Sequence, residues 1–203
     1  MDSDAWDQRY SQADLVWSVE PNRFFADETA AVTPGRALDL GAGEGRNAIW
    51  LAERGWETTA VDFSAVGLDK GRELARSRGV TVTWVVEDLL QYRPAPGSFD
   101  LVGVVYIHLV AEQRRRVLHA AMTALAPGGR LIVIGHHADN ITDGVGGPQD
   151  PRVLFTPSEI VADLSGLHIL RAARLLREVD TGSGIRTAVD ALVVGVAPSH
   201  APH

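Results

Sequence analysis

The residues best suited to chemistry lie in one glycine-rich segment, Leu38-Asp39-Leu40-Gly41-Ala42-Gly43-Glu44-Gly45-Arg46-Asn47. Glycines let a ligand approach the backbone closely, and a helix that begins after such a loop directs free N–H groups and its positive dipole end at an anion. A dinucleotide site requires G-x-G-x-x-G, but Arg46 stands three positions after Gly43 and Gly45 comes one residue early. The segment therefore predicts a site for one small anionic group and argues against a pyrophosphate. An ordinary strand-to-helix turn is the alternative.

Two acidic residues follow the next two predicted strands. Asp62 lies 19 positions after Gly43, where its carboxylate can accept both hydroxyls of a ribose. Asp88 ends the following strand and can accept from an exocyclic amine such as that of adenine. Either acid can instead cap a local turn. Because open α/β sheets bind ligands at the carboxyl ends of their strands, the three features together predict a ligand with a diol, an amine-bearing base and one anionic group.

The elements that position these residues alternate between strand and helix. Strands are expected at residues 37–40, 57–61, 81–86, 99–105 and 130–135. Helices are expected from the glycine loop to Arg54, from a Ser64 cap to Gly79, and over 111–125 before the breaker Pro127-Gly128-Gly129. This order predicts a doubly wound α/β domain, with a parallel sheet and helices on both faces.

The last part of the chain departs from that alternation. Thr156-Pro157-Ser158-Glu159 forms a capping box with proline at the first helical position, so a helix begins there. Two β-like runs follow, over 168–176 and 187–197, joined by the turn-rich residues 180–184 without a helix. They are expected to pair antiparallel. The fold class is thus α/β, with a mostly parallel seven-stranded sheet that ends in an antiparallel hairpin.

These motifs resemble those of the class I S-adenosylmethionine-dependent methyltransferases over residues 35–135. Residues 38–45 resemble motif I of that family, Asp62 stands at its ribose-binding acid, and Glu87-Asp88-Leu89 is similar to its adenine-contacting segment. Phe99-Asp100-Leu101-Val102 matches its fourth strand, and residues 125–131 are similar to its turn before strand five. Gly45-Arg46-Asn47, with residues 6–10, most resembles the tellurite-resistance and thiopurine methyltransferase branch, whose members act on small and often soft acceptors.

The resemblance implies S-adenosylmethionine as cofactor, S-adenosylhomocysteine as product, and methyl transfer to a small molecule, with a sulfur, selenium or tellurium nucleophile as one option. The expected cofactor-binding residues are Asp39, Gly41, Ala42, Gly43, Arg46, Asn47, Asp62, Phe63, Asp88, Leu89, Val105, Trp6 and Tyr10. A soft, already anionic acceptor needs no general base, whereas an oxygen or amine acceptor usually does.

The N-terminal segment is the expected lid over the cofactor. Trp6 and Tyr10 are four residues apart and share one face of a short helix, with Trp17 beyond. Their rings can cover the cofactor and attract its sulfonium through cation–π contact. The alternative is that these rings only attach the helix to the core.

Tyr106 and His108 follow the fourth strand, where the family shapes its acceptor pocket, and they are the expected catalytic residues. Either residue can orient or deprotonate a nucleophile, although local hydrogen bonding by His108 and packing by Tyr106 are the alternatives. His136, His137 and Asp139 follow strand five and are expected to line the acceptor pocket. Adjacent histidines on an extended segment point to opposite sides, so no metal is expected. Residues 138–155 are too long for a plain connector and predict a loop that gates or selects substrate.

The amino-acid composition narrows the class of protein and its partners. The chain has 203 residues, 45% of them hydrophobic, no cysteine and a net charge of −7, which is typical of a globular protein and unfavourable for nucleic-acid binding. No apolar run is long enough to span a bilayer and no export signal is apparent, so we expect a cytoplasmic monomer or homodimer without a nucleic-acid or membrane partner. Two alternatives stay open: a nicotinamide-dependent oxidoreductase and a non-catalytic S-adenosylmethionine-binding module.

The expected organisation is one methyltransferase domain over residues 1–203. It divides into an N-terminal lid (1–34), a cofactor-binding core (35–135), a substrate loop (136–155), a C-terminal helix and hairpin (156–197) and a tail (198–203).

Overall fold

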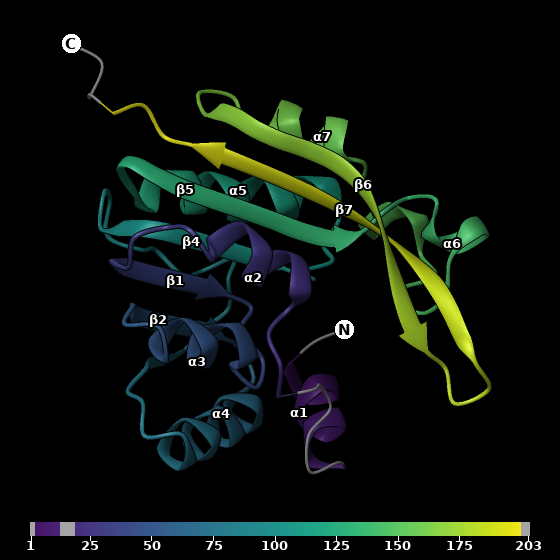
Figure 1. Cartoon of the computed structure of the whole chain (residues 1–203), viewed down its shortest axis with the longest axis horizontal. Helices are drawn as coiled ribbons and strands as arrows, with labels where there is room; N and C mark the ends of the chain where they lie inside the picture. The colour runs from purple at the N-terminus through teal and green to yellow at the C-terminus, as the bar shows by residue number, and fades with distance from the viewer. Residues whose placement is uncertain (1–2, 13–18, 200–203) are drawn as a thin grey trace.

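The structure, a computed structural model, describes residues 3–12 and 19–199. Its centre is a seven-stranded sheet in the order β3-β2-β1-β4-β5-β7-β6 (Figure 1). The strands are β1 (Arg36–Leu40), β2 (Glu57–Asp62), β3 (Thr83–Val86), β4 (Phe99–Val105), β5 (Leu125–His136), β6 (His168–Asp180) and β7 (Ile185–Val196). The predicted fold class is confirmed, and strand four has the predicted bounds.

Strands β1 to β5 are parallel because a helical crossover separates most of them, whereas β7 pairs antiparallel with both β5 and β6. The strand order reverses beside β1, which pairs with β2 on one side and β4 on the other. Open sheets of this kind bind ligands at such a switch point, outside the carboxyl ends of the strands. The glycine loop after β1 and the residues after β4 therefore meet at the place where a ligand is expected.

Helices cover both faces of the sheet. In Figure 1, α2 (Arg23–Thr29), α3 (Arg46–Ala52) and α4 (Ala65–Ser77) lie in front of it, and α5 (Ala111–Ala124) and α7 (Pro157–Asp163) lie behind. Successive side chains of β1 point to opposite faces of the sheet, and each face has its own hydrophobic core. Leu38 and Leu40 pack with residues of α5 and α7 on one face, whereas Ala37 packs with Phe25 of α2 on the other. The remaining helical segments are α1 (Ser3–Ser11), α6 (Asn140–Asp143) and the 3-10 turn η1 (Pro151–Val153).

The two predicted helix caps are confirmed. Ser64 Oγ accepts from the Gly67 amide at the start of α4. At α7, Thr156 and Glu159 form the reciprocal capping box, with proline in the first turn. These local interactions need no tertiary information, because each satisfies helix N–H groups that have no partner within the helix.

The strand bounds differ most from the prediction at β5, at β3 and in the C-terminal hairpin. Strand β5 begins at Leu125 and not at Arg130, because Leu125 pairs with Phe99 and the ladder then skips to Leu101–Arg130. Strand β3 is shorter than predicted and begins at Thr83. The hairpin strands are longer than predicted, and in Figure 1 their far end projects beyond the other strands. The predicted breaker lies in the irregular part of this ladder, where Gly128 and Gly129 form backbone hydrogen bonds with Ala197 beyond the end of β7.

A buried ion pair joins the two rear helices. Arg114 of α5 places Nη2 2.8 Å and Nε 2.9 Å from Asp163 Oδ2 of α7, and the side chains are 8% and 9% exposed. Truncating one partner leaves an uncompensated buried charge, so we expect Asp163→Ala to lower the free energy of unfolding by about 3–5 kcal/mol. Urea denaturation followed by circular dichroism measures the change. The double variant Arg114→Met, Asp163→Leu is the control, and it should recover most of the lost free energy of unfolding. A double variant as unstable as Asp163→Ala would contradict the claim that an uncompensated buried charge causes the loss.

No helix in the described part of the chain has both the length and the apolar character needed to cross a membrane.

Candidate active site

A cavity of about 390 Å³ opens at the carboxyl end of the central strands. Its wall combines five segments: α1, the glycine loop with the start of α3, the end of β2, the residues after β4, and part of the loop before α7. The lining residues are Trp6, Tyr10, Gly41, Ala42, Gly43, Arg46, Asn47, Asp62, Phe63, Val105, Tyr106, Ile107, His108, Leu109, Pro148, Asp150 and Val153. Most of the predicted site residues therefore surround one cavity.

The glycine loop has the shape that the sequence predicts. Gly41 has a φ of 76°, and a β-carbon there would overlap the side chain of Ile107, so only glycine lets the loop pack this closely. Asp62 holds the loop from the next strand: its Oδ2 accepts from the Gly43 amide over 2.8 Å, and its Oδ1 accepts from the Ser64 amide over 2.9 Å. Burial raises the pKa of Asp62, and these two amide bonds oppose the rise. One carboxylate thus shapes the loop and faces the cavity.

Asp39 lies beneath the same loop on β1. It is 1% exposed, and neither carboxylate oxygen has a hydrogen-bond partner among the described residues. Burial raises the pKa of Asp39 to about 7, with Asp62 adding to the rise and Arg46 opposing it. It does not line the cavity itself, but Arg46 beside it does. A carboxyl group buried in this way is uncommon in a folded protein, which makes Asp39 a candidate functional residue.

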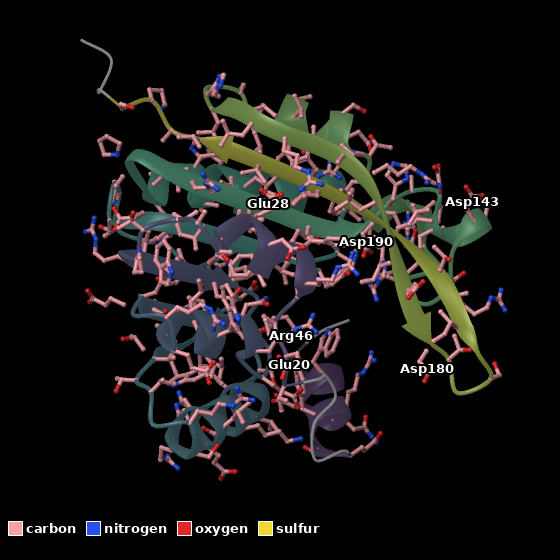
Figure 2. The ribbon with its side chains drawn as sticks, viewed as in Figure 1. Glu20, Glu28, Arg46, Asp143, Asp180 and Asp190 are labelled. Carbon is pink, nitrogen blue, oxygen red and sulfur yellow. The ribbon has the colours of Figure 1, made fainter. Side chains whose placement is uncertain are left out.

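The first residues of α3 connect the loop to the lid segment. Arg46 lines the cavity, and burial lowers the pKa of its guanidinium. Asn47 accepts from the Asn22 amide over 2.9 Å through its Oδ1, which ties the chain before α2 to the cavity wall. Figure 2 labels Arg46 and, across the same end of the sheet, Asp190 of the hairpin.

The predicted lid residues lie at the cavity. Trp6 and Tyr10 both line it, with ring centroids 5.5 Å apart. Tyr10 is buried against α4, where Lys70 Nζ donates to the Tyr10 carbonyl and the Tyr10 ring lies beside Gly67. Trp17 lies outside the described residues. The lid residues therefore both pack on the core and face the cavity.

Two predicted adenine contacts lie apart from the cavity lining. Asp88 is exposed, and its Oδ1 accepts from the Leu90 amide over 2.9 Å, which is the turn-capping arrangement named as its alternative. Leu89 is buried in the rear core and lies beside Gly41. Their roles toward a cofactor stay predictions.

The far wall of the cavity carries the predicted catalytic pair. Tyr106 has a φ of 57°, an uncommon conformation for a residue other than glycine, and its amide donates to the Ile134 carbonyl over 2.7 Å. Burial and the neighbouring Asp190 raise the pKa of Tyr106. His108 accepts from the His136 amide over 3.2 Å through Nε2, and burial, aided by the His136 ring, lowers its pKa to about 4.

Behind this wall lies a charged cluster centred on Asp190, which is fully buried on β7. Tyr106 Oη and Arg177 Nε donate to Asp190 Oδ2 over 2.8 and 2.7 Å. His136 Nδ1 lies 3.1 Å from Asp190 Oδ1, within ion-pair range but not aligned as a hydrogen bond. Burial alone would raise the pKa of Asp190, but contacts with His136, Arg177 and Tyr106 outweigh it and hold that pKa below its ordinary value.

Asp190 and Arg177 were not among the site residues predicted from the sequence. The available signal was a single acid within the apolar run Ala188-Val189-Asp190-Ala191-Leu192, because an unpaired charge is rarely fully buried.

The residues after β5 occupy different places from those expected. His136, His137 and Asp139 are absent from the cavity lining. His137 is buried and accepts from the Asp139 amide over 3.0 Å through Nδ1. Pro148, Asp150 and Val153 of the predicted substrate loop do line the cavity. The loop is anchored by Asn140, whose Nδ2 donates to the Gly146 carbonyl and whose Oδ1 accepts from the Val189 amide.

The fold and the site together define a doubly wound α/β domain with a cavity at the switch point, lined by a glycine loop and a strand-end acid. Residues 37–129 match the family described as a methyltransferase domain. A demethylmenaquinone methyltransferase of Thermus thermophilus is 34% identical over 124 residues, covering 60% of this chain and 54% of the relative. A tRNA 5-carboxymethoxyuridine methyltransferase of Escherichia coli is 31% identical over 114 residues, covering 52% and 42%. The chain thus spans about half the length of the curated relatives it matches.

Solved structures agree with this assignment at the level of the fold. TehB from Haemophilus influenzae has a TM-score of 0.74 at 17% identity, covering 96% of this chain and 66% of that one. The N-methyltransferase NodS from Bradyrhizobium japonicum, solved with S-adenosylhomocysteine, has a TM-score of 0.72 at 18% identity, covering 97% and 98%. Residues 37–129 thus match a methyltransferase domain, and the fold around them is that of S-adenosylmethionine-dependent methyltransferases.

Proposed function

We propose that this domain transfers the methyl group of S-adenosylmethionine to a small-molecule acceptor. The observation that carries the proposal is the Asp62 carboxylate, which faces the cavity while bonded to the Gly43 amide. That arrangement places a hydrogen-bond acceptor for a ribose beside a loop of backbone N–H groups, as an adenosyl ligand requires.

The residues present fit the cofactor. Asp62 would hold the ribose and Arg46 the carboxylate of the methionine part. The carboxyl of Asp39, buried beneath the loop, would attract the ammonium group from behind the cavity lining. Phe63, at the end of β2, and Val105, at the end of β4, supply apolar wall. When bound, the sulfonium supplies an activated methyl group for in-line displacement. The protein would mainly position the acceptor and exclude water. The loop that carries Pro148 and Val153 into the cavity wall would help to exclude the water.

A small acceptor suits the cavity better than a macromolecule. A volume of about 390 Å³ lies within the range for small-molecule sites and leaves limited room beside a cofactor. The net charge of −7 disfavours a nucleic-acid backbone, although one relative is named for a tRNA nucleotide. A soft sulfur, selenium or tellurium nucleophile remains the proposed acceptor class, in line with the sequence resemblance to the tellurite-resistance and thiopurine branch.

The test is incubation with methyl-labelled S-adenosylmethionine and a panel of thiols, chalcogen oxyanions, halides, phenols and amines. We expect labelled product from at least one small acceptor and S-adenosylhomocysteine in equal amount. Binding of the cofactor without transfer to any member would instead support a non-catalytic binding module. Binding of a reduced nicotinamide cofactor in a fluorescence titration would support the oxidoreductase alternative.

We propose that Trp6 and Tyr10 form a lid on the bound cofactor. The double variant Trp6→Ala, Tyr10→Ala is expected to weaken cofactor binding about tenfold or more, because each aromatic contact contributes roughly 1 kcal/mol. Isothermal calorimetry measures the affinity, and Gln8→Ala on the exposed side of α1 is the matched control. Unchanged affinity in the double variant would leave these rings with a packing role alone.

A further inference from the structure

A second cavity, called here the α5 groove, lies on the rear side of the sheet, between α5 and the turn after β3 (Figure 1). Its volume is about 580 Å³, within the range of small-molecule sites, and it shares no lining residue with the cavity at the glycine loop. One wall is a single face of α5, made by residues three and four positions apart: Glu112, Arg115, Arg116, His119, Ala120 and Thr123. The other wall is the turn, through Leu89, Leu90, Arg93 and Pro94.

The three arginines of the α5 groove lack carboxylate partners, although the chain has 26 acidic and only 19 basic residues. Exposed arginines elsewhere, such as Arg152 and Arg174, pair with acidic neighbours. Within residues 3–12 and 19–199, by contrast, no carboxylate forms an ion pair with Arg93, Arg115 or Arg116. The positive charge of the groove is therefore not neutralised by the described part of the protein.

The backbone brings two of these cations together. Arg93 Nη1 donates to the Leu90 carbonyl over 3.1 Å, and Arg116 Nη2 donates to the same oxygen over 3.3 Å. Two positive charges that meet at one oxygen repel each other, and an anion bound by both guanidinium groups would relieve the repulsion. Glu112 lies one helical turn before Arg116, which is the spacing of a favourable pair, but it forms no such pair.

We propose that the α5 groove binds a small organic molecule through a phosphate monoester group, as a site separate from the proposed methyl transfer. Three arginines and one glutamate give the groove a net charge of two positive units. A phosphate monoester carries about −1.5 to −2 charges at pH 7 and offers three acceptor oxygens, which the planar guanidinium group matches in geometry. Leu89, Leu90 and Pro94 supply apolar wall for the organic part.

The first experiment titrates phenyl phosphate into the full chain without S-adenosylmethionine, so the result does not depend on methyl transfer. Calorimetry should show saturable binding at one site. The double variant Arg93→Gln, Arg116→Gln is expected to weaken it at least about tenfold, because two charge-assisted hydrogen bonds to the phosphate are lost. The matched control is Arg76→Gln, Arg186→Gln, which removes the same charge from two exposed arginines outside the groove and should leave the affinity within about twofold.

The ligand series tests the chemical class. Phenyl sulfate has a similar shape but a single negative charge, and we expect it to bind at least about threefold more weakly than phenyl phosphate. Inorganic phosphate should also bind more weakly, because it lacks the ring that contacts the apolar wall. Equal affinity for phenyl sulfate would contradict the assignment to phosphate monoesters.

The second experiment locates the bound molecule. Amide signals in the ¹H–¹⁵N spectrum should shift at residues 89–94 and 112–120 when phenyl phosphate is added, and those of residues 41–47 should stay in place. Shifts confined to residues 41–47, no saturable binding, or equal weakening in the two double variants would overturn the proposal. A short single-stranded RNA that binds more tightly than phenyl phosphate and loses affinity in both double variants would instead indicate a surface for a nucleic-acid backbone.

Discussion

Replacing Asp62 by alanine is expected to weaken S-adenosylmethionine binding by at least about 100-fold, because two hydrogen bonds to a charged acceptor contribute roughly 1.5–3 kcal/mol each. The variant loses the proposed ribose acceptor, and it also releases the Gly43 and Ser64 amides that Asp62 now holds at 2.8 and 2.9 Å. The loop and the ligand contact are therefore lost together. Calorimetry measures the affinity, and circular dichroism confirms that the variant is folded.

Two further variants separate these effects. Asp62→Asn keeps one carbonyl oxygen and the size of the side chain, so we expect an affinity between those of the wild type and Asp62→Ala. Asp69→Ala removes an exposed acid of α4 that pairs with Arg72, and it should leave the affinity unchanged. Full affinity in Asp62→Ala would refute the assignment of the cavity.

Asp39→Asn is expected to stabilise the domain without ligand at pH 8 while weakening cofactor binding about tenfold. In the folded state burial raises the pKa of Asp39 to about 7, against an ordinary value of 3.8. Between pH 3.8 and about 7 the folded protein therefore keeps a proton on Asp39 that the unfolded chain releases. The contribution of Asp39 to the free energy of unfolding is fully present below pH 3.8 and is lost as the pH rises to about 7. The raised pKa corresponds to about 4 kcal/mol at most, of which asparagine should recover a substantial part.

Urea denaturation of Asp39→Asn and the wild type at pH 5 and pH 8 tests the sign. The difference in unfolding free energy between the two proteins should be larger at pH 8 than at pH 5. Calorimetry at pH 8 should show the weaker cofactor binding, because the proposed partner of the ligand ammonium has lost its charge. Equal stabilisation at both pH values would contradict the burial argument, and stronger cofactor binding would contradict the assigned role.

Much of the fold was predictable because its signals are local. The caps at Ser64 and Thr156 depend on residues within one helical turn, and strand four is predicted by its own β-type run of residues 101–105. The start of β5 was not predictable, since Leu125 becomes strand only through its pairing with Phe99. The length of the hairpin likewise depends on each strand being the partner of the other.

The site also has features that the sequence predicts and features that only the tertiary structure decides. Residue types and spacing alone determined the glycine loop, the acid at Asp62 and the doubly wound order, because a strand-end loop and the next strand must meet at one edge of a parallel sheet. Only the tertiary structure decided that His108 has its lone pair engaged and that His136 faces Asp190, 54 positions later in the chain. These contacts across the sheet are set by strand order and register, not by neighbours in the sequence.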